Sequence, residues 1–593
     1  MCAGGTLRAS MKRLVGTLLL ALCAGAHAFA APSDYILQKD VAVPMRDGVV
    51  LRADVLLPRG KGRFSTLVYR TPYNKEEALK GYTTFQHAVE RGYAVVVQDV
   101  RGRYASAGEF AAYQNEGHDG YDTIEWAARQ PWSNGNIGTF GLSYPGAVQW
   151  LAAVESPPHL KAMVPAMTFS TPRNFFYSSG VFDMSWIAWT WEDIAPDLRA
   201  KKNLPGQKTY PEAEAAWPKA KDKMLWTQPL DALAELRGVA PFYYEWLKHP
   251  PDDSWWNWAE LRDKYARVQA AVLNLSGWYD EDYGPEGATT NYLGLLAARK
   301  GQRDARTHLL IGPWIHGVQE TAKTKSGERE FGPAAAINYD QVVLDWMDHY
   351  LRGAVNGVER QAAVRLFVMG DNRWREETSW PPPAARATSF YLAGGGKSVP
   401  GKLQPVAPSG EQVSVFTSDP AHPVFDPYAG HLGAHDYRDL SRRSDVLVFE
   451  TEPLAKDIEA LGPVTAEIYT ACDCTDFDLW TRLLDVGPDG TAFNLMSPGS
   501  DMLRASYRDP EHRSPLKPGE VYKLVLANMR TGNVFKAGHR IRVQVSASFF
   551  PDFSRNLQTG ELESTSAKMR VATIRIYHDA ERASRLVLPV IPR

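Results

Sequence analysis

A serine at position 143 lies in a sequence pattern that can make its hydroxyl a nucleophile. An apolar run that favours a strand, Ile137 to Phe140, precedes it, and a stretch that favours a helix, Ala147 to Ala152, follows it. A serine on such a strand-to-helix turn is exposed, and the helix N-terminus is directed at the reacting atom. The pattern is Gly-x-Ser-x-x-Gly, with Pro145 where the general motif has its second glycine. An ordinary turn serine also fits, so the hypothesis depends on partners elsewhere.

Two candidate partners occur downstream. Asp280 follows the apolar run 271–275, and His316 follows the apolar run 308–311. Each could be an ordinary loop residue. The order nucleophile, acid, base along the chain, with each member just after a predicted strand, is nevertheless that of the α/β-hydrolases. The sequence therefore predicts a triad of Ser143, Asp280 and His316.

This triad implies acyl transfer. His316 removes the proton of Ser143 and later protonates the leaving group. Asp280 fixes the imidazole tautomer and stabilises the imidazolium. The tetrahedral oxyanion needs hydrogen-bond donors, and the backbone N–H of Tyr144, the residue after the nucleophile, is the expected first donor. Such a reaction needs no metal ion and no organic cofactor.

The elements that must position these residues alternate between strand and helix. Buried runs at 65–69 and 94–98 end in polar motifs, and residues 119–129 have apolar side chains at helical spacing. Alternation of this kind predicts a largely parallel sheet covered on both faces. Functional groups of such sheets gather where strands end, which is where Tyr73 and Ser143 lie.

Five motifs resemble those of the cocaine esterase-like (CocE/NonD) serine hydrolases, which belong with the X-Pro dipeptidyl-peptidases and α-amino acid ester hydrolases. The motifs are Arg70-Thr-Pro-Tyr73, Gln98-Asp-Val-Arg-Gly102, Gly141-Leu-Ser-Tyr-Pro-Gly146, Gly277-Trp-Tyr-Asp280 and Gly312-Pro-Trp-Ile-His316. The resemblance covers essentially the whole mature chain, and the family's own elbow spacing accounts for Pro145. It implies that the phenolic O–H of Tyr73 is the second oxyanion donor. Without the resemblance, Tyr73 is interpreted as a packing aromatic.

The resemblance also implies an α/β-hydrolase domain with an inserted helical cap and a C-terminal β jelly-roll domain. The predicted parts are a signal peptide (1–30), the catalytic domain (31–160 and 265–370), the cap (161–264) and the jelly roll (371–593). The cap segment is rich in proline and holds half of the 18 tryptophans. Most of these rings are expected to pack the cap's own core, so none is named as a substrate contact. Alternating strands after residue 383 indicate an antiparallel sandwich, expected to be a structural partner.

The N-terminus predicts export. A basic pair precedes the apolar run Leu14 to Ala24, and small residues suited to cleavage follow at Ala28 and Ala30. The run is too short for a membrane anchor, and the bulky Leu22 disfavours lipidation at Cys23. We expect a periplasmic or secreted protein with no integral membrane segment after signal cleavage.

Composition limits the partners. The 66 lysines and arginines nearly balance 68 aspartates and glutamates, and no basic block occurs, which argues against nucleic acid. The expected partner is a small-molecule ester or amide substrate; the oligomeric state is not predicted. After export, Cys472 and Cys474 remain. They lack the further ligands of a zinc site, and a disulfide between such near neighbours is expected to be strained. We therefore expect two unpaired small residues within a sheet.

Three functions remain open. The preferred one is an esterase; the alternatives are an X-Pro dipeptidyl-peptidase or α-amino acid ester hydrolase, and an inactive carbohydrate- or partner-binding protein. Asp282 matches a position at which amino-ester hydrolases hold the substrate α-ammonium group, but Tyr283 replaces a second acid. Asp183, Glu192 and Asp193 are further ammonium candidates, although solvated charges on the cap are the simpler interpretation. The residues around the elbow resemble the esterase branch more closely.

Overall fold

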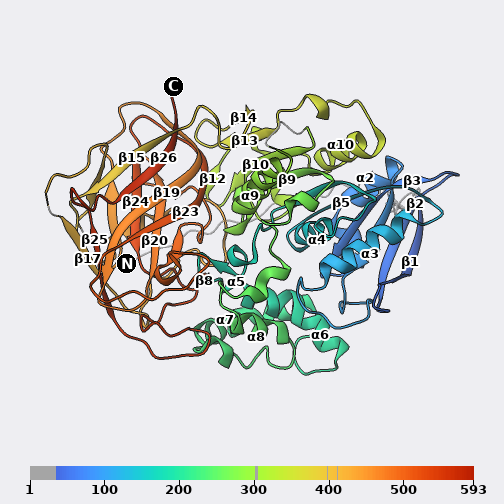
Figure 1. The fold of residues 1–593 in the computed structure, drawn as a ribbon, viewed down its shortest axis with the longest axis horizontal. Helices are drawn as coiled ribbons and strands as arrows, with labels where there is room; N and C mark the ends of the chain where they lie inside the picture. Colours follow the sequence, from blue (N-terminus) through green and yellow to red (C-terminus); the bar gives the residue numbers. More distant parts are fainter. Residues whose placement is uncertain (1–34, 301–304, 397–398, 411, 593) are drawn as a thin grey trace, which may run out of the picture. The chain divides into compact units, whose positions relative to one another are not determined.

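The strands predicted around the candidate triad form one ten-stranded sheet (Figure 1). The computed structural model describes residues 35–300, 305–396, 399–410 and 412–592, so the predicted signal peptide lies outside the described residues. In spatial order the strands are β1 (Tyr35–Pro44), β2 (Val50–Pro58), β4 (Ala94–Asp99), β3 (Phe64–Thr71), β5 (Ser133–Leu142), β6 (Leu160–Ala166), β9 (Ala271–Tyr279), β10 (Thr307–Ile315), β13 (Val364–Val368) and β14 (Arg373–Glu377).

Neighbouring strands from β4 to β13 pair in parallel, whereas β1, β2 and β14 make antiparallel pairs at the two edges. The central strands β4 and β9 are buried along their whole length. Burial on both faces explains the nearly continuous apolar runs in the sequence. The largely parallel sheet agrees with the predicted α/β class.

Helices cover both faces of this sheet. They are α1 (Lys75–Gly81), α2 (Thr84–Glu90), α3 (Glu116–Ala128), α4 (Tyr144–Ala153), α9 (Tyr283–Ala298) and α10 (Tyr339–Arg352). Successive residues of β3 point to opposite faces. Val68 belongs to the core that contains Leu151 of α4, whereas Leu67 belongs to the core that contains Met347 of α10. Gly353 ends α10 in the left-handed conformation, which glycine adopts without strain.

A mostly helical segment separates β6 from β9. It contains the hairpin β7 (Tyr177–Ser178) and β8 (Val181–Phe182), then α5 (Ser185–Trp189), the π-helix η2 (Thr190–Ile194), α6 (Ala195–Lys201), α7 (Tyr210–Trp226) and α8 (Pro241–Lys248). Prolines stand in the first turns of α6, α7 and α8, where they are compatible with a helix. Trp246 and Trp256 are fully buried in this segment. We call it the cap.

The C-terminal part is β-rich, and Figure 1 colours it from yellow to red. Its sheet comprises β15 (Arg386–Ala393), β16 (Gly401–Gln404), β17 (Val413–Ser418), β18 (Leu447–Glu450), β19 (Ile458–Cys472), β20 (Asp478–Val486), β21 (Ala492–Asn494), β22 (Met502–Arg504), β23 (Tyr522–Phe535), β24 (Arg540–Ser546), β25 (Ala572–Tyr577) and β26 (Arg585–Ile591). The pairing is antiparallel except between β16 and β18. We call this part the β-domain.

Cys472 and Cys474 form a disulfide, so the expectation of two unpaired residues is wrong. β19 ends at Cys472 and the chain bends directly after it. The bend brings the two Cα atoms to 5.0 Å, whereas residues two apart in a continuous strand are separated by about 6.6 Å. The end of the strand therefore permits a bond that a continuous strand would disfavour.

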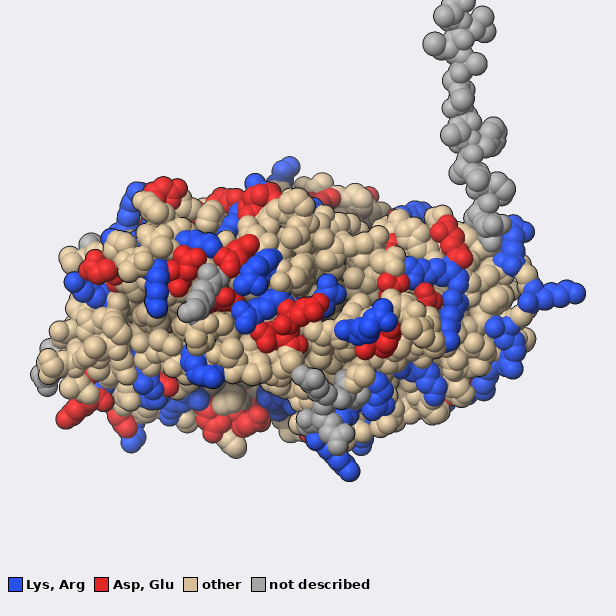
Figure 2. Space-filling model, turned by 90° about the horizontal axis from the view of Figure 1, so that it is seen from above, with Lys and Arg blue, Asp and Glu red and all other residues tan. Residues whose placement is uncertain are grey.

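The surface carries both signs of charge. Figure 2 shows lysine and arginine interspersed with aspartate and glutamate on one face of the molecule. This mixture matches the formal net charge of −2. None of the helices in the described ranges combines the length and the apolar character that crossing a membrane requires.

Candidate active site

Ser143 occupies a strained turn between β5 and α4. Its φ of 67° and ψ of −128° lie in a region that non-glycine residues rarely adopt. The turn is held on both sides: the Ser143 N–H donates to the carbonyl of Ala166 at 3.1 Å, and the Ser143 carbonyl accepts from the N–H groups of Gly146 and Ala147, both at 2.8 Å. The hydroxyl therefore stands at the carboxyl end of β5, as a nucleophile elbow requires.

Close packing explains the glycines of the elbow motif. A Cβ at position 146 would lie 2.5 Å from the Ala166 carbonyl oxygen, so only glycine lets α4 approach β6 this closely. Gly141 has a φ of 142°, and a Cβ there would lie 2.6 Å from the Cβ of Pro145. The proline thus occupies the space above Gly141, and the second essential glycine falls one position later than in the general motif.

Asp280 and His316 directly follow the adjacent parallel strands β9 and β10. His316 Nδ1 lies 2.6 Å from Asp280 Oδ1. The Asp280 side chain is fully buried, and its other oxygen accepts a hydrogen bond from Ser276 Oγ at 2.8 Å. A Cβ on Gly284, in the first turn of α9, would lie 1.8 Å from Asp280 Oδ2. The carboxylate is therefore fixed by contacts on all sides.

The charges around His316 favour its protonated form. Burial alone would lower the pKa of His316, but the charge of Asp280, its hydrogen bond, and the charge of Glu281 together raise it above the ordinary value. Burial raises the pKa of Glu281 to about 7, although the charge of His316 opposes this. The imidazolium that forms during general base catalysis is thus stabilised where it is needed.

All three predicted triad residues lie at the carboxyl edge of one sheet, directly after strands β5, β9 and β10. Met167 connects their loops. It follows the Ala166 that binds Ser143, its N–H donates to the Leu275 carbonyl at 2.8 Å, and its sulfur accepts from the Gly317 N–H at 3.4 Å. The histidine side chain is 22% exposed, and Ser143 is half-buried, so both can be reached by a small molecule.

Tyr73 lies next to the nucleophile. It follows β3 by two residues, and its hydroxyl lies within hydrogen-bonding reach of the Ser143 hydroxyl. It also accepts a hydrogen bond from the indole Nε1 of Trp189 at 3.0 Å. Burial, together with the charge of Asp193, raises the pKa of Tyr73, so the phenol keeps its proton at neutral pH. The resemblance-based placement of Tyr73 at the elbow thus agrees with the geometry.

Tyr144 presents its backbone rather than its side chain. It is the first residue of α4, so its N–H has no acceptor within the helix. Its ring points into the core, where the hydroxyl donates to Glu116 Oε1 at 2.8 Å and accepts from the Tyr113 N–H at 3.0 Å. Arg70, on β3, forms a buried ion pair with Glu116 at 2.8 Å. These contacts hold Tyr144 in place and leave its N–H available to an oxyanion.

The candidate ammonium contacts lie deeper than expected. Asp282 is buried and accepts a hydrogen bond from Ser178 Oγ of the cap at 2.6 Å. Burial and the nearby Asp183 raise the pKa of Asp282 well above its ordinary value. Asp183 is also buried, which raises its pKa to about 6, so its interpretation as a solvated cap charge is wrong. Asp183 and Asp282, which are buried, and Glu281, which is half-buried, therefore form a cluster of carboxyls beside the triad.

Glu192 and Asp193, the other two ammonium candidates of the cap, do not belong to that cluster. Burial raises the pKa of Asp193 to about 7, and the neighbouring charge of Glu192 adds to the shift. Burial also raises the pKa of Glu192. Both residues belong to the π-helix η2 on the Tyr73 side of the site.

Aromatic rings close the site on the cap side. Tyr283 stands edge-on to the His316 ring with centroids 6.4 Å apart and packs against Phe175 at 4.6 Å. The Trp189 ring is stacked over that of Tyr144 at 6.3 Å. Trp189 was not singled out in the sequence because nothing distinguishes it from the other cap tryptophans. These rings place apolar surface beside His316 and beside Tyr73 and Tyr144 at the elbow.

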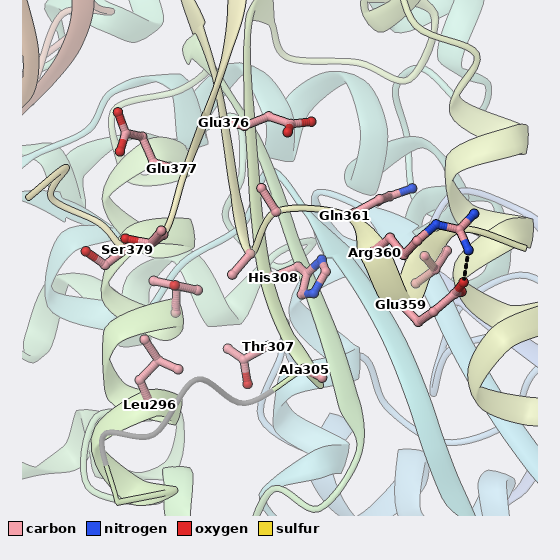
Figure 3. Close-up of a pocket in the computed structure, with 15 residues that line it drawn as sticks. Leu296, Ala305, Thr307, His308, Glu359, Arg360, Gln361, Glu376, Glu377 and Ser379 are labelled. Carbon is pink, nitrogen blue, oxygen red and sulfur yellow. Dashed lines mark hydrogen bonds and ion pairs between the residues drawn. The ribbon is translucent and has the colours of Figure 1, made fainter. Parts of the chain in front are cut away.

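A separate cavity of about 730 Å³ lies elsewhere on the sheet (Figure 3). Its lining includes Thr307 and His308 at the start of β10 and Glu377 at the end of β14. His316 follows the opposite end of β10. The nine residues of that strand separate the two places by about 30 Å, at about 3.3 Å per residue. This cavity is therefore not the substrate site of the triad.

Comparisons with known proteins cover nearly the whole chain. The sequence profile of the X-Pro dipeptidyl-peptidase (S15 family) matches residues 47–318, and that of the X-Pro dipeptidyl-peptidase C-terminal non-catalytic domain matches residues 356–587. A cocaine esterase from Rhodococcus sp. (strain MB1 Bresler) is 33% identical, over 94% of this chain and 99% of the esterase.

Two solved structures share the fold over almost their full length. An aminopeptidase from the marine sediment archaeon Thaumarchaeota archaeon has a TM-score of 0.79 at 25% identity and covers 94% of this chain and 97% of its own. An α-amino acid ester hydrolase labelled with selenomethionine has a TM-score of 0.78 at 25% identity and covers 97% of this chain and 100% of its own.

Proposed function

This chain belongs to the X-Pro dipeptidyl-peptidase (S15) family of hydrolases, and we propose that it cleaves a carboxylic ester through an acyl-Ser143 intermediate. The family and the fold, an α/β-hydrolase domain with a β-rich C-terminal domain, are as the motifs predicted. The observation that carries the proposal is the hydrogen bond of 2.6 Å between Asp280 and His316, which follow β9 and β10 at the same edge of the sheet as the strained turn of Ser143.

The proposed reaction proceeds in two steps. His316 takes the proton of the Ser143 hydroxyl while the oxygen bonds to the ester carbon, and the oxyanion is stabilised by the Tyr144 N–H and the Tyr73 O–H. The C–O bond to the leaving group breaks as His316 returns the proton to that group. Water then attacks the acyl-serine, again with His316 as the base, and releases the carboxylic acid and free Ser143.

An ester with an apolar acyl group fits the surroundings of the triad best. Tyr283, Phe175 and Trp189 place aromatic surface beside it. Tyr283 stands where a second carboxylate would favour an amino-acid substrate, and burial raises the pKa of its hydroxyl, so it remains neutral. The Rhodococcus relative that is 33% identical to this chain is named a cocaine esterase, which supports the same choice.

A substrate panel tests this function. We expect the purified protein to hydrolyse p-nitrophenyl esters, with a larger kcat/KM for aromatic or aliphatic acyl groups than for acetyl, and to act weakly on X-Pro anilides. Ser143→Ala should remove the activity, since a missing nucleophile costs about 10⁶ in kcat in serine hydrolases. Preferred cleavage of X-Pro anilides would replace the esterase with a dipeptidyl-peptidase. No hydrolysis of either class would leave the binding-protein alternative.

A second candidate, an amino-ester hydrolase, is favoured by the carboxyl cluster of Asp183, Glu281 and Asp282. Carboxyls that burial keeps partly protonated would gain an opposite charge from a bound α-ammonium group. If so, esters of free α-amino acids should exceed their N-acetylated counterparts in kcat/KM, and Asp282→Asn should lower that ratio by about 10-fold or more, as loss of a buried ion pair implies. An unchanged ratio would leave Asp282 as a structural contact with Ser178.

We also propose that the protein is exported. The basic pair, apolar run and small residues within positions 1–30 support this, although they lie outside the described residues. The disulfide between Cys472 and Cys474 is the type of bond that oxidising compartments maintain.

A further inference from the structure

We propose that Trp189 of the cap is a positioning residue for the oxyanion hole: its indole N–H holds the Tyr73 hydroxyl so that the phenolic proton faces the elbow. The inference rests on the proposed serine hydrolase function and extends it to the cap. In this arrangement a side chain of the cap positions a hydrogen-bond donor of the catalytic domain.

The direction of the hydrogen bond carries the argument. Trp189 Nε1 lies 3.0 Å from the Tyr73 hydroxyl. An indole N–H can only donate, so the phenolic oxygen must accept this bond. The single proton of Tyr73 is then left for another acceptor, and the Ser143 hydroxyl lies within hydrogen-bonding reach of the phenol. An oxyanion formed on the ester carbon bonded to Ser143 would be an acceptor for that proton.

The donor itself is rigidly held. The Trp189 ring is stacked over Tyr144 with 16° between the ring planes and over Tyr113 with 19°. Trp186 packs edge-on against it at 5.2 Å, a contact that the phenyl ring of Trp186→Phe can still make. Since Tyr144 supplies the other oxyanion donor through its backbone, Trp189 contacts both residues of the proposed hole.

A fully buried arginine fixes the distance between the cap and the Tyr73 loop. Arg103 Nε donates to the carbonyl of Pro72, the residue before Tyr73, at 2.9 Å. Its Nη1 and Nη2 donate to the carbonyls of Ile194 at 2.7 Å and Asp193 at 2.8 Å. These two residues end the π-helix η2, which begins directly after Trp189. The guanidinium group of Arg103 thus holds the backbone just before Tyr73 and the helix just after Trp189 in a fixed relative position.

The hydrogen bond from Trp189 is expected to have a small but measurable effect on kcat. A neutral hydrogen bond contributes about 0.5–1.5 kcal/mol net, and a hydroxyl that accepts one bond becomes a better donor for the next. Loss of the indole N–H should therefore lower kcat by about 10-fold at most. Loss of the phenol in Tyr73→Phe removes an oxyanion donor and should lower kcat by about 10²–10³.

The test compares two tryptophans of one helix in a double-mutant cycle. Trp189→Phe keeps an aromatic ring but lacks the donor. Trp186→Phe is the matched control, because its indole donates instead to the Phe175 carbonyl at 2.9 Å. We expect Trp189→Phe to lower kcat about 5–10-fold with KM within about twofold, and Trp186→Phe to leave kcat within about twofold. In a Tyr73→Phe background, Trp189→Phe should have no further effect on kcat.

Additive effects of Trp189→Phe and Tyr73→Phe, or a change in KM alone, would overturn the inference. An equal loss of kcat in Trp186→Phe would also overturn it, because the effect would then be one of cap packing. Trp189→Met, which lacks a donor and adapts to irregular space, provides a second variant if the first does not fold, and the same loss of kcat is expected. Activity that survives Ser143→Ala would instead refute the proposed function itself.

Discussion

At the scale of single residues, His316 determines how the enzyme should respond to pH. General base catalysis needs the neutral imidazole, and the charge and hydrogen bond of Asp280 raise the pKa of His316 above its ordinary value. Activity should therefore decline as pH falls through a midpoint above about 6.5, the ordinary histidine value. A profile of kcat/KM against pH measures this midpoint. Glu281 contributes to the same midpoint, because burial raises the pKa of Glu281 to about 7.

Two variants separate the contributions to that midpoint. Asp280→Asn removes the dominant charge, so the midpoint should move to lower pH while kcat falls by about 10⁴, as loss of the triad acid does elsewhere. Glu281→Gln is the control: it should lower the midpoint slightly and retain most of kcat. An acid limb that stays in place in Asp280→Asn would mean that His316 is not the group that titrates.

Residues that are recognisable from their own type and from a neighbouring strand can be found in the sequence. Residues that matter through contacts with distant parts of the chain cannot. The positions of Ser143, Asp280 and His316 at strand ends could be predicted because each has a reactive side chain just after a recognisable strand. Trp189 could not, because its partner Tyr73 lies 116 residues away and nine tryptophans in the cap segment look alike. Ser276, which donates to Asp280, was likewise missed, since a serine within a buried strand carries no catalytic signal.

At the scale of elements, the start of α9 limits where Asp280 can lie. A Cβ at position 284 would come within 1.8 Å of Asp280 Oδ2 and 2.9 Å of Ser276 Oγ. Gly284→Ala should therefore displace the carboxylate and lower kcat by about 10²-fold or more, the cost of a misplacement near 1 Å. Overpacking should also lower the free energy of unfolding by about 1–3 kcal/mol.

Gly81→Ala is the matched control for this variant. An added Cβ at position 81 meets nothing within 4 Å, so kcat and thermal unfolding should stay close to wild type. Wild-type kcat in Gly284→Ala would show that the carboxylate tolerates displacement and that the close contact does not position the triad.

The strands and helices of the catalytic domain could be predicted because their apolar runs are nearly continuous and end in glycine or polar motifs. Strand ends were harder to predict. β9 and β10 continue to Tyr279 and Ile315, four residues beyond the apolar runs that identified them. The bend after Cys472 was missed for the same reason, since alternation alone does not reveal where a strand stops.

At the scale of the whole molecule, the cap is joined to the β-domain through its short hairpin. The Met184 N–H donates to the Asp552 carbonyl at 2.9 Å, and the Ser554 N–H donates to the Phe182 carbonyl at 2.9 Å. Such backbone pairs between segments more than 350 residues apart leave no pattern in the sequence. The order of the parts could therefore be predicted, but not the contacts that join them.

The proposed export makes a prediction for the entire chain. The mature protein should be recovered from the periplasm or the medium with its N-terminus at Phe29 or Ala31, because cleavage is expected after Ala28 or Ala30. Intact-mass measurement of the fractionated protein checks this. A full-length chain that remains in the cytoplasmic fraction would contradict it.

The central claim is that His316, paired with Asp280, activates Ser143. A fluorophosphonate probe followed by peptide mass spectrometry tests it most directly. We expect labelling of Ser143 in the wild type, no labelling in Ser143→Ala, and labelling slowed by about 10²-fold or more in His316→Ala, since an unactivated hydroxyl is a weak nucleophile. Labelling of another residue, or an unchanged rate in His316→Ala, would contradict the claim.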